Sequence, residues 1–273
     1  MIILKLGDIL ELVNKIAPFD IAEKWDNCGL QAGNLNWEVK RVIIGLDASL
    51  SLMEAAQDNR CDLVLTHHPL MLHPEKSIDF NKMPGKAVAI SARDKINIVS
   101  AHTNLDKASD GLNDYFADKI GMQKKEIFYI EEFSDIPNDQ PIGFGRIGYL
   151  EKRISLKQLS KTVKEKLALN HLRVIGNMDL PIHSIAVCTG SGGSFVDTFL
   201  KSNADVYITG DIKYHEARLV EENSKALIDV GHFGSEYIAI DLLFEKLSQA
   251  VNKAGLNIEI KKFKKEKDPF IIV

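Results

Sequence analysis

Short apolar runs alternate with amphipathic segments between residues 42 and 106. An unbroken apolar run of four to six residues is typical of a strand buried on both faces, whereas apolar positions three or four apart are typical of a helix. The predicted strands are residues 42–47, 63–66 and 96–100, and the intervening helices begin near Ser51 and Pro84. A helix capped by Asp8 and Glu11 precedes them. This alternation predicts an α/β fold with a mostly parallel sheet flanked by helices.

A second α/β set follows a polar stretch at about residues 124–141. This stretch contains the acidic, turn-forming segment 135–139, which is typical of a domain boundary. A helix is predicted from the capping pair Ser155 and Gln158, and a long helix is predicted to run to about Lys253. The further predicted strands are residues 142–150, 172–175, 185–188, 206–209 and 226–230. We therefore predict two domains, residues 1–125 plus 231–273 and residues 126–230.

Composition narrows the class of protein. Of the 273 residues, 45% are apolar and 26% are charged, the balance of an ordinary globular protein. The net charge of −4 argues against a nucleic-acid-binding surface, and the Lys-rich segment 261–267 is interpreted as a solvated face. No apolar stretch approaches the roughly 20 residues of a membrane-spanning helix, and segment 1–5 lacks the layout of a signal peptide. The three cysteines are distant from one another, so we expect a cytoplasmic protein without disulfides.

Histidines and carboxylates gather where the predicted strands end. The pair His67 and His68 follows one strand directly, and Pro69 stops that strand. The pairs His102/Asp106 and His232/Glu236 are each four residues apart, a spacing that puts both side chains on one face of a helix. Ser235 is a predicted N-cap that would put Glu236 in the first helical turn. Each pair alone is more typical of a helix-capping arrangement, but three such clusters at strand ends together indicate a metal site.

The chemical types of the candidate ligands narrow the choice of metal ion. Imidazole and carboxylate without thiolate suit zinc, iron or manganese better than calcium. Five candidate ligands favour two ions that share Glu236 over one crowded ion. Paired ions of this kind activate water and hold an oxygen-bearing substrate.

Two other segments have alternative interpretations. The turn Gly190-Ser191-Gly192-Gly193 precedes a helix and could offer N–H groups to a phosphate, but a structural strand-to-helix turn fits better because the P-loop lysine and spacing are missing. The segment Trp25-Asp26-Asn27-Cys28-Gly29 is either a loop that packs at a specific place or a surface turn with one anchoring aromatic.

The order of these motifs resembles the GTP cyclohydrolase 1 type 2 homologue family, also called the NIF-three-like family. The resemblance covers the chain from the first helix to the last, without an inserted domain. The residues that carry it are Trp25-Asp26-Asn27 with Gly29-Leu30, Thr66-His67-His68-Pro69, Ala101-His102-Thr103-Asn104-Leu105-Asp106, Gly190-Ser191-Gly192-Gly193, Gly210-Asp211-Ile212-Lys213-Tyr214-His215 and Gly231-His232-Phe233-Gly234-Ser235-Glu236.

The resemblance implies two α/β domains with a dinuclear metal site in the cleft between them, and a ring-like homohexamer. His102 and His215 would line the site as further ligands or as proton-transfer groups. By position in the motifs, the metal ligands would be His67, His68, Asp106, His232 and Glu236, with Glu236 bridging.

Three functions are compatible with these residues. The family name implies opening of the purine ring of GTP, and a metal-dependent hydrolase acting on another nucleotide or a phosphate ester would need the same groups. A non-enzymatic carrier that stores or delivers metal during cofactor assembly is the second interpretation. A regulatory scaffold that binds protein partners is the third.

Overall fold

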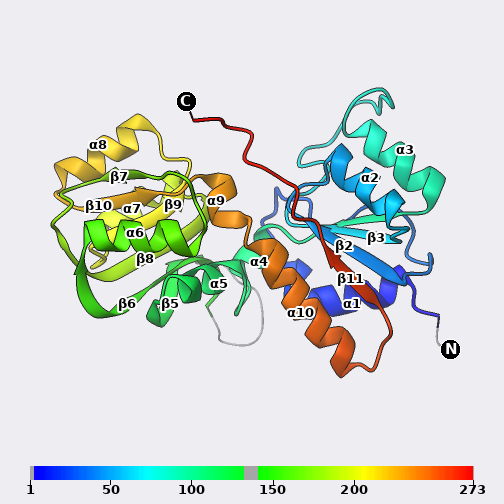
Figure 1. Ribbon diagram of the computed structural model, residues 1–273, viewed down its shortest axis with the longest axis horizontal. Coiled ribbons are helices and arrows are strands. Elements are labelled where there is room, and N and C mark those ends of the chain that lie inside the picture. Colours follow the sequence, from blue (N-terminus) through cyan, green and yellow to red (C-terminus); the bar gives the residue numbers. More distant parts are fainter. Residues whose placement is uncertain (1–2, 132–140, 273) are drawn as a thin grey trace. The chain divides into compact units, whose positions relative to one another are not determined.

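The computed structural model describes residues 3–131 and 141–272, which form an α/β fold with two sheets (Figure 1). The chain divides into unit 1, residues 1–108 with 239–267, and unit 2, residues 109–238 with 268–273. The division therefore lies at different residues from the predicted domain boundaries, because α5 (Leu112–Lys119) and α9 (His232–Glu236) both pack against β8 (Pro181–Ser191) of unit 2. The polar stretch of about residues 124–141, in which the sequence predicts a boundary, begins with a strand, β5 (Gln123–Ile130), and its residues 132–140 lie outside the described residues.

The sheet of unit 1 has five strands in the order β1-β4-β3-β2-β11. All neighbouring strands are parallel except β1 and β4, as the alternating sequence pattern predicts. In Figure 1, α2 and α3 lie over one face of this sheet, and α1 and α10 lie together on the other. The elements are β1 (Gly29–Ala32), β2 (Arg41–Gly45), β3 (Leu63–Thr66), β4 (Asn97–Ser100), β11 (Glu259–Lys262), α1 (Leu6–Ile16), η1 (Phe19–Ile21), α2 (Leu50–Asp58), α3 (Gly85–Asp94), α4 (Thr103–Lys107) and α10 (Ala239–Lys253).

Two helices of unit 1 begin earlier than predicted. Helix α1 starts at Leu6, and Asp8 is not its cap but its third residue, where the carboxylate accepts the N–H of Lys5 at 2.8 Å. Helix α2 is capped by Ser49 rather than Ser51, since the hydroxyl of Ser49 accepts the N–H of Leu52. Both segments offer two polar residues near the start, and sequence spacing alone does not choose between them.

The sheet of unit 2 has six strands in the order β5-β6-β8-β9-β10-β7. Only β8, β9 and β10 run parallel to one another, whereas the other three pairings are antiparallel, so the prediction of a mostly parallel sheet is wrong for this unit. The capping box of Ser155 and Gln158 at the start of α6 is confirmed. The remaining elements are β5 (Gln123–Ile130), β6 (Gly143–Ser155), β7 (Arg173–Ile175), β9 (Val206–Gly210), β10 (Ala226–Asp229), α6 (Leu156–Lys166), η2 (Gly193–Phe195), α7 (Val196–Lys201) and α8 (Tyr214–Glu222).

The glycine turn after β8 is a packing feature. Tyr207 is fully buried, and its hydroxyl donates to the carbonyl of Gly192 at 3.0 Å. A Cβ on Gly192 would overlap the oxygens of Tyr207 and Thr209. The helix that follows, α7, has only six residues. The structural interpretation of this turn therefore fits better than the phosphate-binding one.

Lys225 stabilises the end of α7. Its ammonium group donates to the carbonyls of Phe199, Ser202 and Ala204 at 3.0, 2.7 and 3.0 Å, and it lies 4.7 Å from the centroid of the Phe199 ring. The Phe199 carbonyl also accepts the N–H and the hydroxyl of Ser202, whereas the carbonyls of Ser202 and Ala204 lie beyond the end of the helix, where the lysine supplies a donor.

Lys225→Met is therefore expected to lower the free energy of unfolding by about 1–3 kcal/mol, because it removes the ammonium donor from the carbonyls of Ser202 and Ala204. Chemical denaturation followed by circular dichroism measures the change. Lys201→Met, which removes an exposed lysine from the last turn of the same helix, is the matched control and should change little. Equal effects of the two substitutions would contradict this role of Lys225.

No helix in residues 3–131 or 141–272 combines the length and the apolar character that crossing a membrane requires.

Candidate metal centre

Polar side chains follow the ends of three neighbouring parallel strands of unit 1, β2, β3 and β4, and lie at one edge of the sheet. Gly45 of β2 is paired with Thr66 of β3, which is paired with Ser100 of β4. The residues that follow these strand ends therefore emerge side by side. They include Asp47, His67, His68 and His102.

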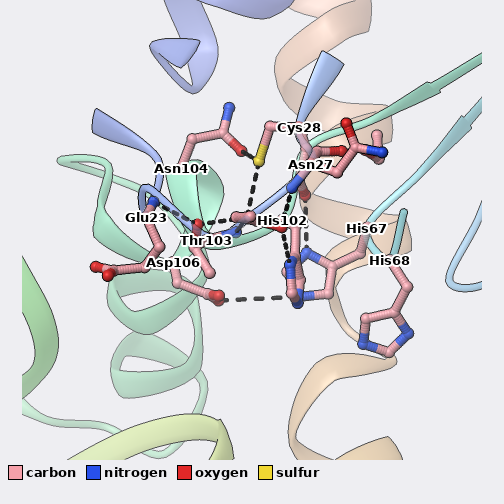
Figure 2. Close-up of polar contacts among 12 residues, drawn as sticks. Glu23, Asn27, Cys28, His67, His68, His102, Thr103, Asn104 and Asp106 are labelled. Carbon is pink, nitrogen blue, oxygen red and sulfur yellow. Dashed lines mark hydrogen bonds and ion pairs between the residues drawn. The ribbon is translucent and has the colours of Figure 1, made fainter. Parts of the chain in front are cut away.

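His67, His68 and His102 form a histidine cluster in unit 1 (Figure 2). Their ring centroids are 5.1–5.5 Å apart, and one nitrogen of each ring lies within 4.8 Å of the others. The carboxylate of Asp106, on α4, lies 3.9 Å from Nε2 of His67. The His67 side chain is fully buried, whereas His68 and His102 are partly exposed. Four donors of these types at this spacing suit a transition-metal ion.

Each ring of the histidine cluster is anchored through Nδ1. A nitrogen that faces a carbonyl or carboxylate oxygen carries the proton, which leaves Nε2 with a lone pair that can bind a metal. The contacts are from His67 to the Ala101 carbonyl at 2.8 Å, from His68 to Asp47 at 2.8 Å and from His102 to Asp26 at 2.9 Å. The same tautomer in three adjacent rings is the arrangement expected of metal ligands.

Asp26 is the most strongly held of these anchors. Its side chain is fully buried, and it accepts the N–H of Thr103 at 3.1 Å, the Thr103 hydroxyl and the thiol of Cys28 at 3.0 Å. Burial works to raise the pKa of Asp26, but the hydrogen bonds outweigh it and hold this pKa well below its ordinary value. Burial and the neighbouring Asp26 raise the pKa of Cys28 to about 12, so this thiol stays protonated and can donate. The loop of residues 25–29 therefore packs at a specific place.

Asp47 is positioned by a residue from the far end of the chain. Both oxygens of Glu266 accept N–H groups at the end of β2, from Leu46 at 3.0 and 2.9 Å and from Asp47 at 2.9 Å. Glu266 belongs to the Lys-rich segment that the sequence predicts to be a solvated face. Since Glu266 is tied to β2, this prediction is wrong for this residue.

Unit 2 carries a second set of candidate ligands at the ends of β9 and β10. The Nδ1 atom of His232 lies 2.7 Å from Oδ2 of Asp211, and its Nε2 atom lies 2.9 Å from Oε2 of Glu236. The His232 side chain is 39% exposed, whereas that of Glu236 is almost completely buried. His232 thus has the same Nδ1 anchoring as the rings of unit 1, and its Nε2 atom is directed at a carboxylate.

The predicted N-cap role of Ser235 is wrong. Gly231 adopts a positive φ of 77°, and α9 begins directly after it, so Ser235 lies inside the helix and Glu236 is its last residue. The Ser235 hydroxyl accepts the N–H of Gly190 and donates to the carbonyl of His232, each at 2.8 Å. Ser235 therefore links the glycine turn to α9.

Gly190 provides the room for the Glu236 carboxylate. Its φ is +67°, and a Cβ at this position would overlap Oε1 of Glu236. Gly190→Ala is expected to displace the carboxylate and to reduce metal affinity at least about tenfold, besides the cost of about 1–2 kcal/mol for a left-handed alanine. Metal titration and thermal denaturation measure the two effects.

Gly255→Ala is the matched control, because Gly255 has a similar φ of +65° but no atom of the described residues within 4 Å of the place that a Cβ would take. It should reproduce the backbone cost without the loss of metal. Equal metal affinity in the two variants would show that Gly190 does not accommodate the ligand.

The two predicted proton-transfer histidines differ in their surroundings. His102 lies in the histidine cluster. His215 is the second residue of α8, where it is exposed and contacts the ring of Tyr214. The catalytic roles of both residues stay predictions. Asp26 and Asp211 were not singled out by sequence reasoning, and their only signal is their place in the polar segments around residues 25–29 and 210–215.

An α/β protein whose parallel strands end in Nδ1-anchored histidines has the features of a metal-binding protein. The chain matches the Duf34/NIF3 (NGG1p interacting factor 3) family over residues 4–269, and it belongs to this family. A GTP cyclohydrolase 1 type 2 homolog from Clostridium acetobutylicum is 33% identical over 98% of both chains. A Helicobacter pylori protein named GTP cyclohydrolase 1 type 2 is 32% identical over 84% of this chain and 86% of its own. A crystal structure of a Bacillus cereus protein related to NIF3 has a TM-score of 0.92 at 24% identity and covers 100% of both chains, which supports the fold.

Proposed function

We propose that the chain is a dinuclear metal-dependent hydrolase with a nucleotide-like substrate. The observation that carries the proposal is the anchoring of four histidines, each of which has its Nδ1 atom within hydrogen-bond distance of an oxygen. Such anchoring orients imidazole ligands and raises their affinity for a metal. The same set of residues also lacks thiolate, so zinc, iron or manganese are the proposed ions.

The proposal names a ligand for each metal-binding position. It takes the five ligands from the family resemblance: His67, His68, Asp106, His232 and Glu236 would be the ligands of two divalent ions, and Glu236 is the ligand that the resemblance assigns to both. When bound, such ions supply an activated water and polarise an oxygen of the substrate.

His102 is the proposed general base. Its Nδ1 contact with the buried Asp26 leaves Nε2 to accept a proton and stabilises the imidazolium that results. His215, exposed on α8, is proposed to return a proton to the leaving group.

The name of the Helicobacter pylori relative makes GTP the first substrate to test. Protein purified without added metal is analysed for its elements, reconstituted separately with zinc, iron and manganese, and incubated with GTP and with nucleotide esters. The expected result is about two ions per chain and turnover that is lost in Glu236→Gln and reduced in His215→Ala. His171→Ala, which removes another exposed histidine of unit 2, is the control and should retain activity. Absence of metal after reconstitution would refute the proposal.

A metal carrier is the second candidate function. It is favoured by the exposure of two ligands, since the side chains of His68 and His232 are 21% and 39% exposed. A carrier should release one ion to a weak chelator and show no turnover of any nucleotide. It should also tolerate His215→Ala, which a hydrolase should not.

We further propose, from the family resemblance, that the protein is a homohexamer and, from the number and spacing of its cysteines, that it acts in the cytoplasm. Light scattering coupled to size-exclusion chromatography tests the assembly. A monomeric mass at micromolar concentration would refute it.

A further inference from the structure

Trp25 occupies an unusual place beside the histidine cluster. Its side chain is 56% exposed, although tryptophan is usually largely buried in folded proteins. The indole lies edge-on to the His102 ring, with 6.3 Å between the centroids. Since His102 is 5.2 Å from His67, the exposed indole is only one ring away from a candidate metal ligand.

The loop around Trp25 is held firmly. The N–H of Asp26 donates to the carbonyl of Glu23 at 2.9 Å, and the Asp26 side chain is fixed by His102 and Thr103. The side-chain amide of Asn27 donates to the carbonyl of Met71 at 2.7 Å, and before Trp25 the N–H of Glu23 donates to the hydroxyl of Thr103 at 3.0 Å. The chain is therefore anchored on both sides of Trp25, so the indole is presented at a defined position.

Core packing does not explain this presentation, because more than half of the side chain contacts solvent. An exposed indole next to a catalytic centre instead offers a flat apolar face and an N–H donor to a ligand. Planar heteroaromatic rings stack on such faces whatever their hydrogen-bonding pattern.

We propose that Trp25 stacks against the heteroaromatic base of the substrate. This inference rests on the proposed function and makes it more specific, because it requires a substrate with a planar base and not only a phosphate ester. Stacking on an aromatic side chain raises affinity for a base by about tenfold to hundredfold.

The chain offers a direct optical test because it contains only two tryptophans. In Trp37→Phe, Trp25 is the sole source of tryptophan fluorescence. GTP is expected to quench this fluorescence with saturation in the metal-loaded protein, whereas inorganic tripolyphosphate, which has the phosphates but no base, should not. Quenching by both to the same extent would overturn the proposal.

Calorimetric titration with GTP then measures the contribution of the ring. Trp25→Leu should weaken binding about tenfold to hundredfold, and Trp25→Phe, which keeps an aromatic face, should weaken it much less. Trp37→Leu is the matched control and should bind as the wild type does. Metal content is measured on each variant, so that lost stacking is distinguished from lost metal.

The outcomes separate this inference from the proposed function. If Trp25→Leu keeps its metal and binds GTP as the wild type does, the stacking role is refuted and the hydrolase proposal stands. If the metal-loaded wild type binds tripolyphosphate but gains nothing from the base of GTP, the stacking role and the nucleotide-like substrate are both refuted. If Trp25→Leu does not fold, the fluorescence titration of Trp37→Phe decides, because that protein retains Trp25.

Discussion

His68→Ala is expected to lower the affinity for metal at least about hundredfold while the protein stays folded. Loss of a single outer-shell partner already costs about 10–100-fold in typical metal sites, and His68 would be a direct ligand. The fold should survive, because the side chain is 21% exposed and lies outside the apolar core of unit 1. The backbone of His68 is held in place because its N–H donates to the carbonyl of Leu46 at 2.9 Å. Elemental analysis and circular dichroism of the same sample measure both quantities.

Two variants make this test specific. Glu236→Gln keeps the shape of the side chain and removes its charge, so it should also lose metal without unfolding. His171→Ala removes an exposed histidine distant in sequence from the strand ends and should retain the metal. If His68→Ala and Glu236→Gln both unfolded, the metal would be structural rather than catalytic. Full metal content in both would exclude these residues as ligands.

The placement of the candidate ligands could be predicted from the sequence because it follows from strand topology. Strands β2, β3 and β4 are parallel, so whatever follows them meets at one edge of the sheet. The apolar runs that form these strands are short and sharply bounded, and His67 and His102 come within two residues of their ends. The convergence of the histidine cluster therefore needs only the order of the strands.

Strand topology also brings Asp47, the anchor of His68, to this edge, but the contacts made by Asp26 and Glu266 could not be predicted, because they are long-range pairs. Asp26 and His102 are 76 residues apart, and Glu266 and Leu46 are 220 residues apart. Nothing in a local pattern distinguishes an aspartate that holds a ring from one that faces solvent. From composition alone, a surface turn is at least as good an interpretation of the segment around Asp26 as a loop that packs at a specific place.

Irregular backbone explains the errors in unit 2. Gly231, with its positive φ, precedes the short helix α9, which ends at Glu236, and α10 begins separately at Ala239. The spacing of apolar residues does not reveal the break between α9 and α10. Ser235 therefore resembled the N-cap of the long helix that is α10 in the structure. Strand β5 lies in the polar stretch that the sequence analysis assigns to a domain boundary, and only the pairing of β5 and β6 with their neighbours shows that the sheet is mixed.

The four anchored histidines differ in what holds them. The Nδ1 atom of His67 faces a neutral carbonyl, whereas those of the other three face carboxylates. Among these carboxylates, those of Asp47 and Asp211 are 53% and 45% exposed, so solvent screens them, but that of Asp26 is fully buried. Among the carboxylates that face an Nδ1 atom, the one least screened by solvent therefore acts on His102.

Asp26→Asn is accordingly expected to lower the free energy of unfolding more than removal of either exposed anchor, Asp47 or Asp211, does. An amide at this position would direct donors at the N–H and hydroxyl of Thr103 and at the Cys28 thiol, all of which donate to Asp26 now. Loss of these charge-assisted bonds should lower the free energy of unfolding by about 2–3 kcal/mol. Without its anchor, the His102 ring should also be less well oriented, which should lower the affinity of the site for metal. Denaturant titration and metal titration measure the two effects, and Asp47→Asn is the control.

The pH dependence of the free energy of unfolding provides an independent check of the contact between Asp26 and His102. Because folding lowers the pKa of Asp26 below its ordinary value of 3.8, the folded chain binds fewer protons at this residue than the unfolded chain does. The stabilisation is therefore complete above pH 3.8 and is lost as the pH falls below it towards the folded-state pKa. Asp26→Asn has no group to titrate, so its stability should fall less steeply over this acid range than that of the wild type, as measured by denaturant titration at several pH values. Equal slopes in the two proteins would show that Asp26 is not an ionised, buried anchor, and the role of His102 as a base held by a carboxylate would lose its support.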